Sequence, residues 1–433
     1  PPPPPPFFLK EQHAIPDPLW SRGLGDVYKR QILLIAALIF SCEKEVEVEV
    51  PVEVIKYVDK EVIVEKEVPV EVIKNVGFPP DAYSFTRNGI STVSYGGQTT
   101  RLKQAEALGS ALKSDSYTKA QLEQMFKDGE GFSDATLNGT GKNLRGKTAA
   151  YGAATVKAQI DAFITEAAEV VAPAWNSDAS AGVAGSYTDP AGSNRTVRIN
   201  AKGLELNQAF LKSLMGALVT DQIINGYLSK TKLDGGTNIA DNDNNVFAYK
   251  GTGATENNAT KMEHYWDEGF GYMFGREADA SNPFNGSGVI LNKYLKKVNA
   301  SDEPGISKVI YDAFKLGRAA IVNSDYTVRD EQATIVKENI SKVIGYKAAY
   351  YLRSGGDEIT AGNWANAHHA LSEGYGFILS LQFTQGSDGN PYMTNEEVNA
   401  MLDKLMAGNG FWDRTAEELE AMAKDVDAAT GLN

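Results

Sequence analysis

The sequence of 433 residues has only one cysteine, four histidines and five tryptophans. A single cysteine cannot form an internal disulfide, so the fold does not depend on a disulfide framework. The sequence also lacks the His-Glu-x-x-His motif of zinc proteases, the Gly-x-Ser-x-Gly nucleophile elbow and the dinucleotide-binding fingerprint. These absences argue against several common classes of hydrolase and oxidoreductase, and they leave few residues that could hold a metal.

Positive charge is also scarce, because the chain has 42 lysines and arginines but 56 aspartates and glutamates, which gives a net charge of −14. An acidic surface repels nucleic acid, so we expect no nucleic-acid partner. The same charge is compatible with cationic ligands or metal ions, although most acidic proteins use it for solubility.

The apolar run at residues 32–40 is too short to span a bilayer, but it suits the core of a signal peptide. A serine follows it, and then the single cysteine, Cys42. We interpret residues 32–42 as a truncated lipoprotein signal with lipidation at Cys42; an incidental cysteine after a truncated signal is the alternative. The next three residues, Glu-Lys-Glu, resemble the surface-export signal of Bacteroidota lipoproteins. We therefore expect an outer-membrane lipoprotein at the cell surface or on the periplasmic face.

The residues on either side of this signal have unusual compositions. Residues 1–31 read as translated sequencing-adapter sequence, because transposon-end DNA encodes Asp26 to Gln31, and we exclude them from the fold. Residues 43–77 alternate valine or isoleucine with glutamate or lysine, and the six-residue run that begins at Pro51 recurs at Pro69. Because the prolines interrupt sheet pairing, we interpret this region as an extended stalk; pairing with a neighbouring chain is the alternative.

From residue 78 onward the periodicity of apolar residues is mainly helical, which predicts an all-α fold. Thr118 and Gln121 have the spacing of a capping box at the start of one helix. Only 197–199 has the character of a strand, and the polar stretches 176–200 and 234–257 are predicted loops. The predicted helices are 98–113, 118–126, 144–171, 204–228, 258–274, 306–322, 326–353, 360–381, 395–406 and 415–429.

Two of these helices carry the same motif. His264-Tyr-Trp-Asp-Glu268-Gly-Phe-Gly recurs as His369-Ala-Leu-Ser-Glu373-Gly-Tyr-Gly. The repeat indicates an internal duplication, and we predict two helical bundles, residues 78–275 and 276–433. Histidine and glutamate four residues apart lie on one face of a helix.

Such a pair can provide two ligands to a divalent metal such as iron or zinc. The predicted metal ligands are His264, Glu268, His369 and Glu373, with Glu263, Asp267 and His368 as further candidates. A buried hydrogen-bonded clamp without metal is the structural alternative. It is favoured by the glycines of the motif, which cost about 1 kcal/mol each in a helix and therefore suggest close helix packing.

Four segments resemble a lipoprotein family of unknown function, domain of unknown function family 4856. They are Lys261 to Tyr272, Gly96-Gly-Gln-Thr-Thr-Arg101, Leu144-Arg-Gly-Lys-Thr148 and Lys212-Ser-Leu-Met-Gly-Ala217. More distantly, the layout is similar to imelysin-like proteins. That resemblance implies two duplicated bundles, a His-x-x-Glu motif, a link to iron uptake and, in some members, metallopeptidase activity. In this sequence Asp267 stands three residues after His264, and Ser372 stands three after His369.

These observations predict a cell-envelope lipoprotein that binds a metal ion or a metal-bearing ligand for uptake, with an outer-membrane transporter as a possible partner. A metallopeptidase-like hydrolase is one alternative. A surface glycan-binding or scaffold protein, in which the His–Glu pairs are purely structural, is the other.

Overall fold

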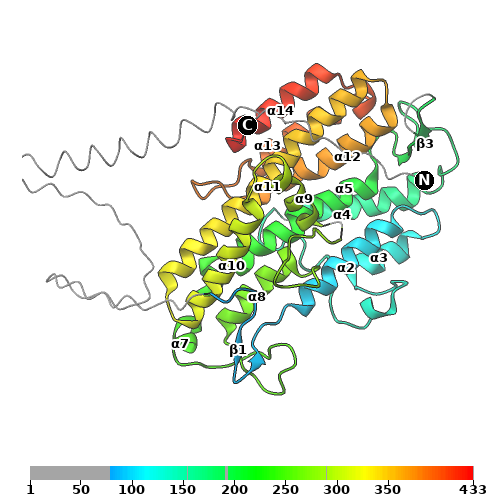
Figure 1. Ribbon diagram of the computed structural model, residues 1–433. Coiled ribbons are helices and arrows are strands. Elements are labelled where there is room, and N and C mark those ends of the chain that lie inside the picture. Colours follow the sequence, from blue (N-terminus) through cyan, green and yellow to red (C-terminus); the bar gives the residue numbers. More distant parts are fainter. Residues whose placement is uncertain (1–78, 154, 191–193, 289, 433) are drawn as a thin grey trace, which may run out of the picture. The chain divides into compact units, whose positions relative to one another are not determined.

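The computed structural model describes residues 79–432, apart from 154, 191–193 and 289 (Figure 1). The expectations for residues 1–31, 32–42 and 43–77, including lipidation at Cys42, lie outside the described residues. Within the described part of the chain, no helix is long and apolar enough to cross a membrane.

Helices dominate the described residues, which confirms the all-α fold class. They are α2 (Gly96–Ala111), α3 (Lys119–Lys127), α4 (Thr155–Glu166), α5 (Leu206–Leu214), α6 (Lys230–Leu233), α7 (Asn238–Asp243), α8 (Lys261–Phe274), α9 (Leu291–Ala300), α10 (Ile306–Val322), α11 (Tyr326–Thr360), α12 (Trp364–Ser380), α13 (Asn395–Leu405) and α14 (Ala416–Thr430). Three short 3₁₀ turns are η2 (Ala135–Leu137), η6 (Leu381–Phe383) and η7 (Gly410–Asp413). Three π-helical segments are η3 (Ala167–Val171), η4 (Met215–Thr220) and η5 (Gln222–Tyr227).

The strands form two small antiparallel hairpins. Strands β1 (Thr86–Arg87) and β2 (Ile90–Ser91) pair with Thr86 opposite Ser91. Strands β3 (Gly185–Thr188) and β4 (Thr196–Ile199) pair with Gly185 opposite Ile199. The strand predicted at 197–199 lies within β4, inside a stretch that was otherwise predicted to be a loop.

Local sequence signals fix several helix starts. Thr118 and Gln121 form the predicted capping box at α3, with the side chain of each accepting the backbone N–H of the other. Thr260, Thr394 and Thr415 begin α8, α13 and α14 in the same way. Each box satisfies two backbone donors that a helix start otherwise leaves without a partner.

The predicted helix 144–171 differs most from the structure. Its first ten residues form turns, and α4 begins only at Thr155. Ala149 has a φ of 45°, a left-handed conformation that ends helical geometry. The carboxylate of Asp221 accepts the N–H of Tyr151 at 3.0 Å, so a contact distant in sequence holds the turn in place. Helix α9 was not predicted at all.

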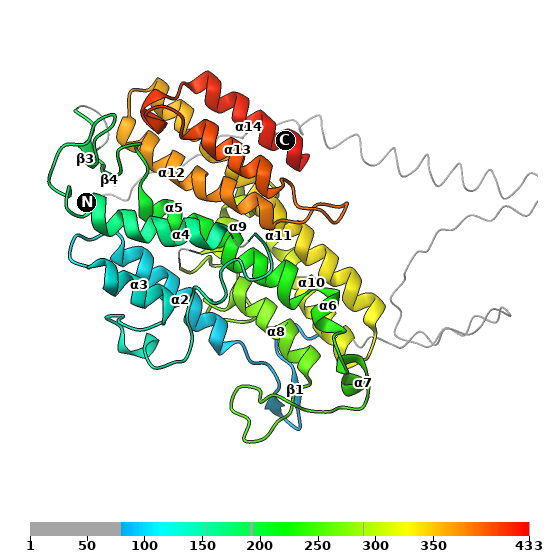
Figure 2. The same cartoon turned by 180° about the vertical axis from the view of Figure 1, so that it is seen from behind.

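The main core is continuous across residue 275. Helix α5 is buried along its whole length and packs against α2, α4 and α12, while α11 packs against α10, α12 and α14. In both views α12, α13 and α14 lie together, away from α8 (Figures 1 and 2). The apolar side chains of both predicted halves therefore share one core, and the division into two duplicated bundles stays a prediction.

The motif glycines lie where helices approach closely. A Cβ on Gly271 of α8 would lie 2.4 Å from Cβ of Tyr95, and one on Gly376 of α12 would lie 2.6 Å from the backbone nitrogen of Ser213 in α5. Both distances are too short for real atoms, so only glycine fits. The prediction that the motif glycines permit close packing is thus confirmed for Gly271 and Gly376, whereas a Cβ on Gly269 or Gly374 would have its nearest neighbour at 3.3 or 3.2 Å.

Candidate functional site

Helix α8 places His264 and Glu268 on one face, a turn apart. The capping box between Thr260 and Glu263 fixes the first turn, because Oγ1 of Thr260 accepts the N–H of Glu263 at 3.3 Å and the carboxylate of Glu263 accepts the N–H of Thr260 at 2.7 Å. Nε2 of His264 and Oε2 of Glu268 are 3.8 Å apart, and both residues line one pocket. The first predicted His–Glu pair therefore exists and is accessible from that pocket.

The imidazole of His264 stacks on the ring of Tyr249, with centroids 3.9 Å apart and planes at 16°. Burial lowers the pKa of His264, and the opposing effect of Glu268 does not restore it. The imidazole is consequently neutral at neutral pH, which is the form that binds metals or exchanges hydrogen bonds.

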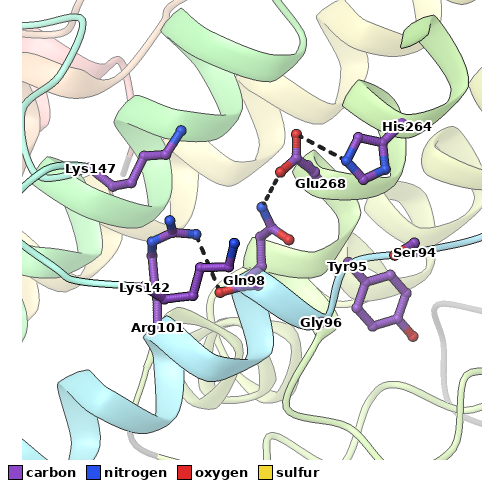
Figure 3. Close-up of a pocket in the computed structure, with 10 residues that line it drawn as sticks. Ser94, Tyr95, Gly96, Gln98, Arg101, Lys142, Lys147, His264 and Glu268 are labelled. Atoms are coloured by element: carbon purple, nitrogen blue, oxygen red, sulfur yellow. Dashed lines mark hydrogen bonds and ion pairs between the residues drawn. The ribbon is translucent and has the colours of Figure 1, made fainter. Parts of the chain in front are cut away.

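Glu268 is held by two neutral donors. Nε2 of Gln98 donates to Oε1 at 2.7 Å, and the hydroxyl of Tyr227 donates to the same oxygen at 3.3 Å. Figure 3 shows the carboxyl group between Gln98 and His264. These contacts orient the carboxylate without neutralising its charge.

The pocket has a volume of about 340 Å³ and lies between the start of α2, the segment 142–147 and α8. Figure 3 shows Arg101, Lys142 and Lys147 across from Glu268 and His264. Three cationic side chains thus converge with one carboxylate, in a chain whose net charge is −14. The lining residues are Ser94, Tyr95, Gly96, Gly97, Gln98, Arg101, Lys142, Lys147, His264 and Glu268.

Arg101 and Lys147 donate hydrogen bonds to neutral groups. Arg101 donates from Nε to the carbonyl of Asn143 at 3.1 Å and from Nη1 to the carbonyl of Gly97 at 3.3 Å. Nζ of Lys147 donates to the hydroxyl of Tyr227 at 3.1 Å. Burial lowers the pKa of Lys147, and the positive charges of Arg101, Lys232 and Lys142 lower it further, against Glu268.

The backbone adds to the positive potential of the pocket. The lining residues Gly96 and Gly97 form the first turn of α2, where helix N–H groups lack partners within the helix. Tyr95, the residue that precedes the helix, gives no side-chain cap. A Cβ on Gly97 would lie 3.2 Å from Cε of Lys142, so glycine leaves room for that side chain.

The candidates Glu263 and Asp267 lie in a buried ion-pair network. Arg318 donates from Nη1 to Glu263 at 2.8 Å and from Nε to Asp267 at 2.9 Å, Arg87 pairs with Glu263 at 2.8 Å, and the Tyr83 hydroxyl donates to Asp267 at 2.7 Å. Burial alone would raise the pKa of Glu263, but the two guanidiniums lower it to about 2. Burial raises the pKa of Asp267 to about 6, since the same Arg318 serves two carboxylates.

The second motif, on α12, has a different environment. Nζ of Lys212 lies 2.8 Å from Oε1 of Glu373, and the hydroxyl of Tyr294 donates to the same oxygen at 3.2 Å. Burial would raise the pKa of Glu373, but Lys212 and His369 lower it to about 2. Nδ1 of His369 lies 2.7 Å from Oε2 of Glu205, while its Nε2 is 3.9 Å from Glu373. Glu373 is thus paired with Lys212 and His369 with Glu205, and the distance of 3.9 Å is too long for a hydrogen bond between His369 and Glu373.

His368 lies in an aromatic cluster. Its ring centroid is 4.2 Å from that of Trp412 and 5.9 Å from that of Tyr187, and the side chain is fully buried. Burial lowers the pKa of His368 to about 4. Its packing role is clear from these contacts.

The two motif helices have different neighbours. Helix α8 packs against α2, α10 and η5, whereas α12 packs against α5, α11 and α13. Among the described residues, no three or more histidine, cysteine, aspartate or glutamate side chains form a group that could hold a metal ion.

A comparison with protein families gives one match. The domain of unknown function DUF4856 matches residues 80–433. The chain belongs to this family. No curated protein and no solved structure matches it.

Three of the four segments on which the resemblance to DUF4856 rests meet at the pocket. Gly96 to Arg101 provides one wall, Leu144 to Thr148 provides Lys147, and Lys261 to Tyr272 provides His264 and Glu268. The fourth segment provides Lys212, the partner of Glu373. Sequence reasoning found the acidic side of the pocket and missed its basic side.

The missed residues do carry a sequence signal. Gly141-Lys-Asn-Leu-Arg-Gly-Lys-Thr148 matches the pattern Gly-x-x-x-x-Gly-Lys-Thr of phosphate loops, and its two lysines, Lys142 and Lys147, line the pocket. The surrounding fold is not that of a nucleotide-binding domain. In the described chain the element directly before this segment is the 3₁₀ turn η2 and not a strand, and the hydroxyl of Thr148 donates to the carbonyl of Leu144 at 3.0 Å. The pattern is therefore informative about charge and not about fold.

Proposed function

We propose that this DUF4856 protein binds a small anionic ligand in the pocket between α2, the segment 142–147 and α8. The observation that carries the proposal is the convergence of Arg101, Lys142 and Lys147 on a cavity of about 340 Å³. Cations in a strongly acidic protein are expected to pair with the abundant carboxylates, yet the hydrogen bonds of Arg101 and Lys147 within the described chain go to neutral groups. A bound anion provides the missing counter-charge.

The electrostatics of the cationic side chains support the same conclusion. Burial lowers the pKa of Lys147, and the like charges of Arg101 and Lys142 lower it further, because like charges raise one another's free energy. Perturbed titratable groups in a pocket are typical of functional sites. Binding of an anion would relieve the repulsion, so the free energy stored in the cluster contributes to affinity.

The proposed cellular role follows from the sequence. Lipidation at Cys42 and a stalk at 43–77 would hold the binding domain outside a membrane as an outer-membrane lipoprotein. A protein of that kind captures ligands for uptake, and an outer-membrane transporter is the partner that such a role requires. The pocket adds a ligand class to this expectation.

Isothermal titration calorimetry on the purified full chain tests the binding step. Inorganic phosphate, sulfate, acetate and citrate are titrated at constant ionic strength. We expect saturable binding of at least one anion, with loss of affinity in Arg101→Gln and Lys147→Met. Lys337→Met is the matched control, because Lys337 is also a lysine whose pKa burial lowers, but it does not line the pocket. Absence of saturable binding, or equal affinity in all variants, contradicts the proposal.

A metal-bearing ligand is the second candidate, and His264 with Glu268 is the observation that favours it. Both line the pocket, and a neutral imidazole with a carboxylate suits a divalent ion. Three adjacent cations oppose a bare metal ion, so an anionic metal chelate fits better. Metal content of the chain, purified without a histidine tag, tests this candidate. If His264→Ala with His369→Ala binds added iron and zinc as the wild type does, the candidate fails. The hydrolase and glycan-binding alternatives stay predictions.

A further inference from the structure

The pocket that we propose as an anion site also contains the carboxylate of Glu268, whose negative charge would repel an anion. Oε1 of Glu268 accepts hydrogen bonds from Gln98 and Tyr227. Within the described chain no donor is hydrogen-bonded to Oε2, because Nε2 of His264, at 3.8 Å, is too far away. Oε2 can therefore accept a hydrogen bond from a ligand, and its side chain is 19% exposed and lines the cavity.

A carboxylate repels a fully ionised anion but accepts a hydrogen bond from an anion that still carries a proton. Hydrogen phosphate has such an O–H group, whereas sulfate at neutral pH has none. The two ions are otherwise alike in shape and charge. A carboxylate within a cationic pocket can therefore distinguish hydrogen phosphate from sulfate.

Phosphate is also the anion that the basic wall suits. Lys142 and Lys147 offer ammonium groups to the cavity, and a lysine ammonium binds phosphate oxygens as a point charge. Arg101 offers a planar guanidinium that matches phosphate geometry. Gly96 and Gly97 at the start of α2 line the same cavity, and the partial positive charge of a helix N-terminus adds to this potential.

We infer that the pocket takes a phosphate group that carries an acidic O–H, and that Oε2 of Glu268 accepts this hydrogen and selects phosphate over sulfate. The inference rests on the proposed function and names its ligand. Arg101, Lys142 and Lys147 balance the negative charge, and Glu268 determines the specificity.

The phosphate group can come from two sources. A cavity of about 340 Å³ holds roughly ten water molecules, which is more room than the five heavy atoms of free phosphate need. A small phosphate monoester fills the space better. Inorganic phosphate and glycerol phosphate are therefore the two probes, and sulfate is the proton-free control.

The test measures the affinity of the full chain for the three probes by calorimetry at pH 5.5 and constant ionic strength, because a phosphate monoester loses its acidic proton above about pH 6. We expect phosphate or glycerol phosphate to bind roughly tenfold to a hundredfold more tightly than sulfate, the effect of one hydrogen bond to a charged group. The tighter of the two phosphate probes identifies the source. In Glu268→Gln we expect the phosphate probes to weaken and sulfate to strengthen.

A role for Glu268 in charge balance alone predicts a different result from selection by its hydrogen bond. If Glu268 only offsets the three cations, Glu268→Gln strengthens all three probes alike, and the inference is wrong. Glu268→Asp is the second variant, because it keeps the charge but withdraws the carboxylate by one methylene; it should weaken phosphate and leave sulfate unchanged. Thermal unfolding establishes that both variants fold.

The proposed function and the inference fail in different ways. If the wild type binds sulfate and phosphate equally well, Glu268 does not select between them and the inference is wrong. The proposed function still holds in that case, provided that Lys147→Met weakens the binding of both anions. Absence of binding of every probe overturns both.

Discussion

The ammonium of Lys212 and the carboxylate of Glu373 form a buried ion pair, with Nζ and Oε1 2.8 Å apart. Glu268, at the equivalent place in the first motif, is held instead by the neutral amide of Gln98 at 2.7 Å. One repeated sequence thus has two environments. The second motif is a closed electrostatic clamp, and the first has a free carboxylate oxygen beside a pocket that contains cations.

Lys212→Met should destabilise the protein strongly, because it leaves the carboxylate of Glu373 buried without a counter-charge. We expect a loss of about 3–5 kcal/mol in the free energy of unfolding. Urea unfolding at neutral pH measures it. The double variant Lys212→Met with Glu373→Met should recover most of the loss, since it removes both charges.

The control for this prediction is Lys424→Met, which breaks an exposed ion pair with Glu420. Exposed pairs contribute about 1 kcal/mol or less. A loss in Lys212→Met as small as in this control would show that Glu373 does not depend on the clamp.

His368 should make the protein sensitive to mild acid. Its pKa in the folded state is about 4, below the ordinary value of 6.5, so the unfolded chain binds a proton that the native state rejects. The contribution of the neutral ring is fully present above pH 6.5 and is lost as the pH falls to about 4. The loss amounts to about 3 kcal/mol.

Denaturant unfolding of wild type and His368→Phe at pH 7 and pH 4 measures this effect. Wild type should lose about 3 kcal/mol more than the variant across this range, because phenylalanine packs in the aromatic cluster without titrating. Parallel losses in the two proteins would assign the acid sensitivity to other groups.

Gly376→Ala should destabilise the contact between α12 and α5. The added Cβ would lie 2.4 Å from Cβ of Lys212 and 2.6 Å from the backbone nitrogen of Ser213, so the helices must separate. Overpacking of this kind costs about 1–3 kcal/mol. Thermal and urea unfolding measure it, with Gly96→Ala as control, because no atom lies within 4 Å of a Cβ at that glycine.

Anion binding should weaken at alkaline pH before an ordinary lysine loses its proton. Burial and neighbouring cations lower the pKa of Lys147, so its positive charge disappears as the pH rises through that lowered value. Lys147→Arg should keep its affinity to higher pH, because a guanidinium stays protonated. Calorimetric titration of phosphate between pH 7 and pH 10 makes the comparison. Identical pH profiles for wild type and Lys147→Arg would exclude Lys147 as the titrating group.

Local signals predicted much of the fold. The all-α class followed from apolar periodicity, and the start of α3 followed from Thr118 and Gln121. The helix predicted at 144–171 was too long, because Ala149 turns left-handed where Asp221, seventy residues away, captures the N–H of Tyr151. A contact between residues so far apart in the chain produces no periodic pattern in the sequence, so it could not be predicted.

The candidate site was likewise predicted only in part from the sequence. Spacing alone placed His264 beside Glu268, since residues four apart in a helix always lie close together. Spacing could not reveal that Arg318 engages Glu263 and Asp267, or that Lys212 neutralises Glu373. Each of those contacts joins segments far apart in the chain.

The sequence by itself therefore determined the all-α class, most of the long helices, the cap of α3, the repeated His–Glu spacing and membership of DUF4856. Only the tertiary structure decided that Glu373 is paired with Lys212, whereas Glu268 lines a pocket with Arg101, Lys142 and Lys147. The reason is electrostatic, because the role of a carboxylate depends on the charges that folding brings near it, and those charges come from other helices and loops.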